Sequence, residues 1–241
     1  MAAGAEAVGA AGSLAGKSAL VTGGSRRVGA AICRELAARG AGVVVHYRHS
    51  EAEAIALNRA LKHGVFSVRG DLANPQEREW VFREAAEWMG RVDILVNNAA
   101  LFARDGEIDA ARLREVNVAA PLDLARRVAA QAGGGCIIQM LDARIARPEA
   151  GPFRAYAATK RELAESVGRL AREWAPRARV NGVAPGPVLV PEGVREAAGE
   201  LPLGRRPTPE DVARAVAFLA ESEAVTGQIL YVDGGQHLGK G

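Results

Sequence analysis

Short apolar runs alternate with amphipathic stretches along almost the whole chain, and no other feature limits the possible fold as much. The runs that predict strands lie at 18–22, 43–47, 65–68, 92–96, 136–141, 179–184 and 229–232. The patterns that predict helices lie at 30–39, 51–63, 75–89, 109–130, 154–174 and 210–221. Strands that alternate with helices predict an α/β fold with one doubly wound parallel sheet of seven strands. No linker or internal repeat divides this pattern.

A glycine-containing turn joins the first predicted strand to the first predicted helix. It comprises Gly23, Gly24, Ser25, Arg26, Arg27, Val28 and Gly29. Glycines let the backbone approach a pyrophosphate, and the unpaired N–H groups of a helix N-terminus favour an anion. A plain strand-to-helix turn is the alternative. The order of strand, glycines and helix favours a dinucleotide cofactor.

The end of the second predicted strand indicates which dinucleotide. A site for NAD usually places Asp or Glu about 20 residues after the glycines, on the ribose 2′-hydroxyl. Residues 41–50 contain no acid, and the strand ends in Tyr47, Arg48, His49 and Ser50. Arginine suits a 2′-phosphate, although a solvent-exposed loop arginine is the alternative. With Arg26 and Arg27 in the first turn, the sequence predicts NADP(H).

Tyr156 and Lys160 form the strongest candidate for catalysis. Their i, i+4 spacing puts both on one face of the predicted helix at 154–174. A free tyrosine has a pKa of about 10, and a neighbouring ammonium lowers it. Asp142 ends the preceding strand. A solvated helix pair is the alternative for the Tyr and Lys, and a turn or cap residue is the alternative for the Asp.

One proline lies inside the predicted helix at 109–130. Pro121 cannot donate to the carbonyl of Asn117, four residues earlier. The free carbonyl could bind water or a ligand, and a simple kink is the alternative.

Composition and charge exclude several other functions. The net charge is +3, but acidic and basic residues are interspersed, as at 78–87, so we expect a solvated mixed surface and no nucleic-acid partner. No apolar run could span a bilayer, and we expect neither a membrane partner nor a signal peptide. The two isolated cysteines, Cys33 and Cys136, indicate reduced thiols in the cytoplasm, and we expect no metal site.

Two segments fall outside the strand and helix pattern. Residues 1–16 are rich in Ala and Gly, and we expect a disordered leader before a single domain at 17–241. Residues 187–207 contain several prolines and glycines with little periodicity, which predicts a mobile loop over a site.

The ordered set of motifs resembles the short-chain dehydrogenase/reductase family over residues 17–236. The matching positions are Thr22, Gly23, Gly29, Asp71, Asn97, Asn98, Ala99, Asn117, Tyr156, Lys160, Pro185, Gly186, Asp233, Gly234 and Gly235. The resemblance implies a single-domain Rossmann fold, a nicotinamide cofactor and a homotetramer. It implies that Tyr156 donates a proton, that Lys160 binds the nicotinamide ribose, and that the Asn117 carbonyl holds a water leading to Lys160.

The resemblance also implies most of the cofactor contacts. They are expected from Gly23, Ser25, Arg26, Arg27, Val28, Gly29, Tyr47, Arg48, His49, Ser50, Asp71, Leu72, Asn98, Ala99, Ala100, Tyr156, Lys160, Pro185, Gly186 and Val188.

Two departures from the general family pattern resemble the pteridine reductases and the related dihydromonapterin or dihydrofolate reductases. Arg27 replaces the middle glycine of the turn, and Asp142 stands in the region of the catalytic serine. In that branch a Phe after the Asn-Asn-Ala motif stacks on the pterin, and Phe102 fits this place. Phe153, three residues before Tyr156, could line the same pocket, although packing is the alternative. The expected substrate residues are therefore Phe102, Asp142, Phe153 and Tyr156.

Three functions remain open from the sequence. The first is an NADPH-dependent reductase of a pterin or folate, with Tyr156 as proton donor. The second is a carbonyl reductase of the same family that acts on an acyl thioester or a small ketone. The third is a non-catalytic NADP-binding protein, which the presence of both Tyr156 and Lys160 disfavours.

Overall fold

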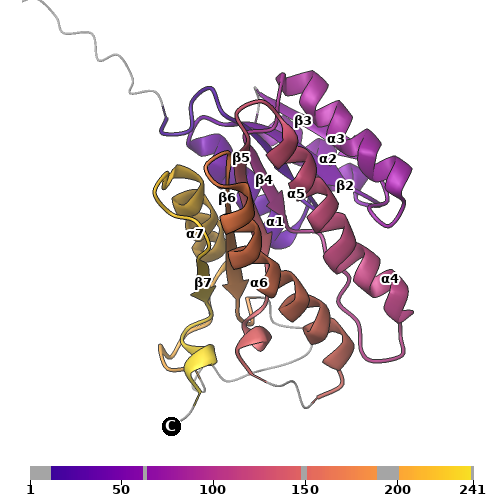
Figure 1. Cartoon of the computed structure of the whole chain (residues 1–241), viewed down its shortest axis with the longest axis vertical. Helices are drawn as coiled ribbons and strands as arrows, with labels where there is room; N and C mark the ends of the chain where they lie inside the picture. The colour runs from indigo at the N-terminus through magenta and orange to yellow at the C-terminus, as the bar shows by residue number, and fades with distance from the viewer. Residues whose placement is uncertain (1–11, 62–63, 148–150, 189–200, 240–241) are drawn as a thin grey trace, which may run out of the picture.

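A single parallel sheet of seven strands forms the centre of the molecule (Figure 1). The computed structural model describes residues 12–61, 64–147, 151–188 and 201–239. The strands are β1 Ser18–Val21, β2 Gly42–Tyr47, β3 Val65–Arg69, β4 Ile94–Asn97, β5 Gly135–Met140, β6 Ala178–Pro185 and β7 Ile229–Val232. Their order in the sheet is β3-β2-β1-β4-β5-β6-β7, and every neighbouring pair is parallel. The predicted doubly wound fold is confirmed.

Helices cover both faces of the sheet. They are α1 Arg27–Ala38, α2 Glu51–Leu61, α3 Pro75–Met89, α4 Ala110–Arg114, α5 Ala120–Ala130, α6 Arg154–Trp174 and α7 Pro209–Glu221. Alternate strand residues point to opposite faces. Val21, Val45 and Ile138 therefore pack with α1, α2 and α7, while Leu20 and Ile137 pack with α3, α5 and α6. Burial on both faces explains why the strands read as continuous apolar runs.

The strand order reverses between β1 and β4, which lie side by side at the centre of the sheet. β1 continues through β2 to β3 in one direction, and β4 continues through β5 in the other. A ligand in an open α/β sheet binds beyond the carboxyl ends of the strands at such a switch point. The glycine turn after β1 and the Asn-Asn-Ala motif after β4 both lie there.

The predicted helix at 109–130 forms, but not as one regular α-helix. Between α4 and α5 the chain adopts a π-helical turn, Glu115–Ala119, in which the N–H of Ala120 donates to the carbonyl of Glu115. Pro121 follows in the first turn of α5. Single π-turns inside helices are common at functional sites. Here the widened turn contains Asn117 and precedes the residue that lacks a backbone donor.

The expectation of a disordered leader up to residue 16 is wrong at its C-terminal end. Leu14 is buried in the core, and its N–H donates to the carbonyl of Arg39 at 2.9 Å. The burial of one leucine and a backbone hydrogen bond fix this stretch beside α1. Residues 1–11 of the predicted leader and residues 189–200 of the predicted loop at 187–207 lie outside the described residues.

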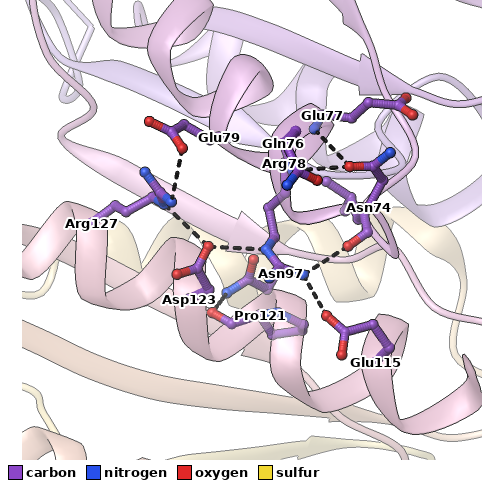
Figure 2. A network of polar contacts seen from close by, with 11 residues as sticks. Asn74, Gln76, Glu77, Arg78, Glu79, Asn97, Glu115, Pro121, Asp123 and Arg127 are labelled. Atoms are coloured by element: carbon purple, nitrogen blue, oxygen red, sulfur yellow. Dashed lines mark hydrogen bonds and ion pairs between the residues drawn. The ribbon is translucent and has the colours of Figure 1, made fainter. Parts of the chain in front are cut away.

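Arg78 corrects the expectation of a solvated surface at 78–87, because it is only 7% exposed. Its guanidinium donates to the carboxylates of Glu115 and Asp123 at 2.8 and 2.9 Å (Figure 2). It also donates to the carbonyl of Leu72 at 2.9 Å. A buried arginine with its charge paired links α3 to the π-turn and to α5. The sequence pattern could not show this, because the two carboxylate partners of Arg78 lie far along the chain.

None of the helices in the described part of the chain combines the length and apolarity needed to cross a bilayer.

Candidate active site

A cleft of about 600 Å³ opens at the carboxyl ends of β1, β2 and β4. This volume lies within the usual range for a small-molecule or cofactor site. Its walls are Gly23, Ser25, Arg26, Arg27, Val28, Gly29, His46, Tyr47, Arg48, His49, Ser50, Gly70, Asp71, Leu72, Asn98, Ala99, Ala100, Leu101, Val116 and Tyr156. Most of the residues expected to hold the cofactor therefore line one continuous cleft.

The glycine turn is packed so closely that its glycines leave no space for a side chain. A Cβ on Gly29 would lie 2.2 Å from the carbonyl oxygen of Gly23 and 2.7 Å from Nδ2 of Asn98. Gly23 itself has φ +60°, a conformation that favours glycine. Among the described non-glycine residues, Arg27 alone has a positive φ, of 52°. It stands where the short-chain dehydrogenase/reductase family usually has the middle glycine of the turn. The chain therefore accepts local backbone strain to place a guanidinium at this point.

Thr22 and Asn98 join the turn to the end of β4. The Nδ2 of Asn98 donates to the carbonyls of Thr22 and Gly23 at 2.9 and 3.0 Å. The Thr22 hydroxyl accepts from the N–H groups of Asn98 and Ala99 at 2.9 and 3.0 Å. These reciprocal bonds hold the two sides of the switch point in register.

His46 also holds the turn, and our sequence reasoning did not assign it to the site. Its Nδ1 accepts from the N–H of Gly23 at 3.1 Å, and its Nε2 lies 3.0 Å from the carbonyl oxygen of Gly70. Burial lowers the pKa of His46 to about 4, so the ring is neutral near pH 7. The sequence signal for this role was the position of His46, a polar residue inside an otherwise apolar predicted strand.

The far end of the cleft is rich in charge. Arg48 and Arg112 both pair with Asp71, at 3.0 and 2.9 Å. Burial would raise the pKa of Asp71, but the N–H of Ala73 and the two guanidiniums outweigh it, so the pKa is lowered. The Arg48 side chain is 39% exposed, and His49 and Ser50 lie beside it on the wall. This end can therefore present cations and a hydroxyl to a phosphate.

Tyr156 and Asp142 meet in the structure. The Tyr156 hydroxyl donates to Oδ2 of Asp142 at 3.1 Å, and the phenol ring is 6% exposed. The other oxygen, Oδ1, accepts from the N–H of Arg144 at 2.8 Å, so Asp142 also caps the short 3₁₀ turn Ala143–Ala146. Both readings of Asp142 from the sequence, as cap residue and as site residue, describe parts of this geometry.

The expected lowering of the Tyr156 pKa by Lys160 is wrong for this arrangement. Burial and the negative charge of Asp142 raise the pKa of Tyr156, because both favour the neutral phenol. Lys160 is buried, donates to the carbonyl of Met140 at 2.7 Å, and lies 5.9 Å from the centre of the Tyr156 ring. Burial lowers the pKa of Lys160 to about 8, although Asp142 opposes the change. Tyr156 is thus a protonated group at neutral pH.

Asn117 is fully buried in the π-turn, and its side chain is engaged. Its Oδ1 accepts from the N–H of Leu101 at 2.8 Å, and its Nδ2 donates to the carbonyl of Leu101 at 3.0 Å and to the Thr159 hydroxyl at 3.1 Å. The side chain therefore joins the loop after β4 to α6. A role toward a ligand would fall to the backbone carbonyl, which cannot accept from Pro121.

Two phenylalanines stand beside Tyr156. The rings of Phe102 and Phe153 stack with centroids 4.6 Å apart, and the Phe102 ring meets the Tyr156 ring edge to face at 4.8 Å. Phe102 is nevertheless 56% exposed. The Arg144 guanidinium carbon lies 5.5 Å from the centre of each phenylalanine ring and pairs with Asp142 at 3.1 Å. The four predicted substrate residues come together, and Arg144 joins them without having been predicted.

Four predicted cofactor residues do not line the cleft: Lys160, Pro185, Gly186 and Val188. Gly186 donates its N–H to the carbonyl of Val232 at 3.0 Å, and Val188 packs against the core. Pro185, Gly186 and Val188 lie at or just after the end of β6, next to a stretch outside the described residues, whereas Lys160 lies in α6. The cleft residues that sequence reasoning missed are His46, Gly70, Leu101 and Val116, which precede or follow recognised motifs.

The cleft fits a dinucleotide phosphate by its own chemistry. Arg26, at the N-cap of α1, makes no side-chain cap, so the helix begins with N–H groups that no capping side chain occupies. The glycines leave no room for a Cβ, as a closely approached backbone requires. Three guanidiniums, from Arg26, Arg27 and Arg48, line the same cleft. Among the described residues, no group of three or more His, Cys, Asp or Glu could hold a metal ion.

Comparison with known proteins agrees with this geometry. The sequence profile of the family described as enoyl-(acyl carrier protein) reductase matches residues 23–237. A candidate ketoacyl reductase of the granaticin polyketide synthase, from Streptomyces violaceoruber, is 34% identical and aligned over 91% of this chain and 96% of its own.

Two solved structures that contain the cofactor are also similar. A blue fluorescent protein from a metagenomic library, in complex with NADPH, is 34% identical with a TM-score of 0.86, covering 92% of this chain and 98% of its own. FolM alternative dihydrofolate reductase 1 from Brucella canis, in complex with NADP, is 33% identical with a TM-score of 0.86, covering 95% and 96%. The cofactor of this chain is NADP(H), and the chain is an oxidoreductase that belongs to the short-chain dehydrogenase/reductase family.

Proposed function

We propose that this protein is an NADPH-dependent reductase of a pterin or a dihydrofolate-type substrate. The observation that carries the proposal is the contact between the Tyr156 hydroxyl and the Asp142 carboxylate, at 3.1 Å. A carboxylate accepts hydrogen bonds from N–H groups, which a pterin ring presents and a simple ketone does not. The similarity to a FolM alternative dihydrofolate reductase supports the same substrate class.

Tyr156 serves as the proton donor in this proposal. Burial and Asp142 raise the pKa of its phenol, so the hydroxyl carries its proton at neutral pH. In this proposal the reduced substrate takes that proton from Tyr156 by general acid catalysis. Lys160 holds the nicotinamide ribose and carries positive charge near the phenol. Asn117 offers its backbone carbonyl to a water between itself and Lys160. NADPH supplies the hydride when bound.

Phe102 and Phe153 form the wall for a planar substrate. Phe102 is 56% exposed although it touches the buried Tyr156 ring, so a flat ring could stack on its free surface. Phe153 supports it from behind at 4.6 Å. Asp142, held by Arg144, would face the ring nitrogens at the edge of that planar group.

A carbonyl reductase is the second candidate, and one comparison favours it. A relative that aligns over 96% of its own length is named as a ketoacyl reductase. A hydroxyl would suffice to hold a carbonyl oxygen, whereas the carboxylate of Asp142 would repel it. The two candidates therefore make opposite demands on position 142.

Asp142→Ser tests the two candidates directly. Turnover of wild type and variant is measured with dihydrobiopterin, dihydrofolate and an acetoacetyl thioester, at saturating NADPH. If the pterin assignment is correct, the variant loses at least about tenfold in pterin kcat/KM, as expected when a charged hydrogen bond is removed. NADPH affinity should change little, because Asp142 does not line the cofactor cleft. A wild type inactive on every pterin, with a variant more active on the thioester, would leave the carbonyl reductase as the function.

We also propose that the chain acts as one reductase domain within a homotetramer in the cytoplasm. The support is the family resemblance and the two buried free thiols, Cys33 and Cys136. Light scattering coupled to size-exclusion chromatography measures the mass in solution. A monomer at micromolar concentration would contradict the tetramer.

A further inference from the structure

His46 makes contacts with both sides of the cofactor cleft. It is 3% exposed, in the last but one position of β2. The side chain accepts from Gly23 N–H at 3.1 Å, and the backbone carbonyl of the same residue accepts from Gly24 N–H at 2.9 Å. On the other side, Nε2 reaches the carbonyl of Gly70 at 3.0 Å. One residue thus joins the turn after β1 to the loop after β3.

The hydrogen-bond pattern determines the form of the ring. Nδ1 must be unprotonated to accept from Gly23, and Nε2 must carry the proton to donate to Gly70. A doubly protonated ring would turn the contact with Gly23 into two opposed donors. The charged group that acts on the pKa of His46 is Asp71, which follows Gly70 in the chain. Asp71 is itself paired with Arg48 and Arg112. Only the neutral Nε2–H tautomer satisfies both partners.

The contact with Gly23 bears on the cofactor because of where Gly23 lies. Its carbonyl oxygen is 2.2 Å from the place where a Cβ on Gly29 would stand, and it also accepts from Asn98. The N–H and the carbonyl of Gly23 lie in successive peptides joined at its Cα, so a change in the backbone angles of Gly23 would move that carbonyl against Gly29, in the first turn of α1. We therefore expect the direction of the Gly23 N–H to affect the position of the α1 N-terminus in the cleft.

We propose that His46 is a positioning residue for NADP(H): its Nδ1 holds the glycine turn in the form that accepts the cofactor phosphates, while the bond from its Nε2 to Gly70 fixes the orientation of the ring. The role goes beyond the substrate assignment and does not depend on it, because the cofactor is common to both candidate reductases. His46 itself need not touch the cofactor.

Two amide variants separate the two contacts of the ring. In His46→Asn, the amide can place its oxygen where Nδ1 stood and keep the acceptor for Gly23, but it cannot reach Gly70. In His46→Gln, the amide nitrogen can reach toward Gly70 while Gly23 loses its acceptor. Each variant removes one of two buried hydrogen bonds, so the two should lose similar thermal stability.

NADPH affinity, measured by fluorescence titration, should distinguish the two variants. We expect His46→Asn to bind within about threefold of wild type and His46→Gln to bind about tenfold or more weakly, as expected for a buried donor without an acceptor. In His46→Gln the KM for NADPH should rise by a larger factor than kcat falls, a difference that a merely structural role would not produce. Equal affinity in the two variants, with only thermal stability lowered, would reduce His46 to a structural residue and overturn the proposal.

A measurement on the wild-type protein covers the case in which a variant does not fold. Long-range ¹H–¹⁵N NMR spectra of the NADPH complex at pH 7 report which ring nitrogen carries the proton. We expect a neutral His46 ring protonated at Nε2. A ring protonated at Nδ1, or at both nitrogens, could not accept from Gly23 and would contradict the proposal independently of any substrate assay.

Discussion

The cofactor side and the substrate side of this site are built in different ways. On the cofactor side, backbone atoms and buried hydrogen bonds define the cleft, and a Cβ at Gly29 would collide with the backbone of Gly23. On the substrate side, side chains define the surface, and Phe102 is 56% exposed. His46, at 3% exposed, and Phe102 represent the two extremes.

The difference indicates how one fold can keep a cofactor and change its substrate. Backbone geometry tolerates few substitutions, because a Cβ at Gly23, Gly24 or Gly29 would press against atoms of neighbouring elements. Exposed side chains on loops can be exchanged with little effect on stability. Of the two residues that our proposal uses to separate a pterin reductase from a carbonyl reductase, Phe102 belongs to the second kind. Asp142 lies between the two kinds, because its side chain is 16% exposed and also caps the 3₁₀ turn. Substitutions on each side of the site test this division.

The largest expected effect separates chemistry from cofactor binding. Tyr156→Phe should lower kcat about 10²- to 10⁴-fold, because general acid catalysis contributes that much. NADPH affinity should remain close to that of wild type, since the phenol hydroxyl bonds to Asp142 rather than to the glycine turn. Steady-state kinetics and a fluorescence titration measure the two quantities. Turnover near the wild-type rate would remove Tyr156 as proton donor.

On the cofactor side, the neutral His46 ring should make the stability of the fold decrease in acid. The pKa of His46 is about 4 in the fold against an ordinary value of 6.5. Below pH 6.5 the unfolded chain takes up a proton that the folded chain does not, so the free energy of unfolding falls as pH decreases from 6.5 to 4. The loss attributable to His46 is about 3 kcal/mol.

Urea unfolding at pH 7, 5.5 and 4.5 measures that loss, with His46→Asn as the control. The control lacks the titrating ring, so its stability should decline less steeply over the same interval. Parallel curves for the two proteins would show that His46 is not the group responsible for the acid sensitivity.

Crowding at the glycine turn gives the next largest effect. Gly29→Ala places a Cβ 2.2 Å from a carbonyl oxygen, and such overpacking costs about 1–3 kcal/mol. Because the turn must shift, NADPH affinity should fall together with the melting temperature. Gly168→Ala in α6 is the matched control, since no atom lies within 4 Å of its added Cβ. Helix propensity predicts that the control is slightly stabilised, by about 0.5–1 kcal/mol. Unchanged NADPH binding in Gly29→Ala would contradict the close-packed cleft.

The smallest effect concerns Arg27, where strain and charge oppose each other. Arg27→Gly removes a side chain from a residue at φ 52°, which should stabilise the fold by about 1 kcal/mol. The same change removes a cation from the cleft wall, so the preference for NADPH over NADH should decrease by roughly 1.5 kcal/mol, the lower end for a charged hydrogen bond. Thermal unfolding and titration with both cofactors measure the two effects. A variant with unchanged cofactor preference would assign the 2′-phosphate to Arg48 and its neighbours instead.

The sequence by itself determined the fold class and the cofactor. Apolar runs alternating with amphipathic helices require a parallel sheet buried on both faces, and the glycine turn after the first run identifies the phosphate end. The absence of an acid after the second run, and the spacing of Tyr156 and Lys160, are also local features. Each depends on residues close together in the chain, where periodicity and intrinsic chemistry suffice.

Tertiary structure decided what those residues touch. The burial of Arg78, the acceptor role of His46 and the stacking of Phe102 on Phe153 all join residues at least 23 positions apart. The raised pKa of Tyr156 likewise depends on the place of Asp142, which precedes it by 14 residues across a turn and a loop. The strand order β3-β2-β1-β4-β5-β6-β7 brings these partners together. Residue pattern along the chain carries no information about that order, because every doubly wound arrangement buries the same apolar runs.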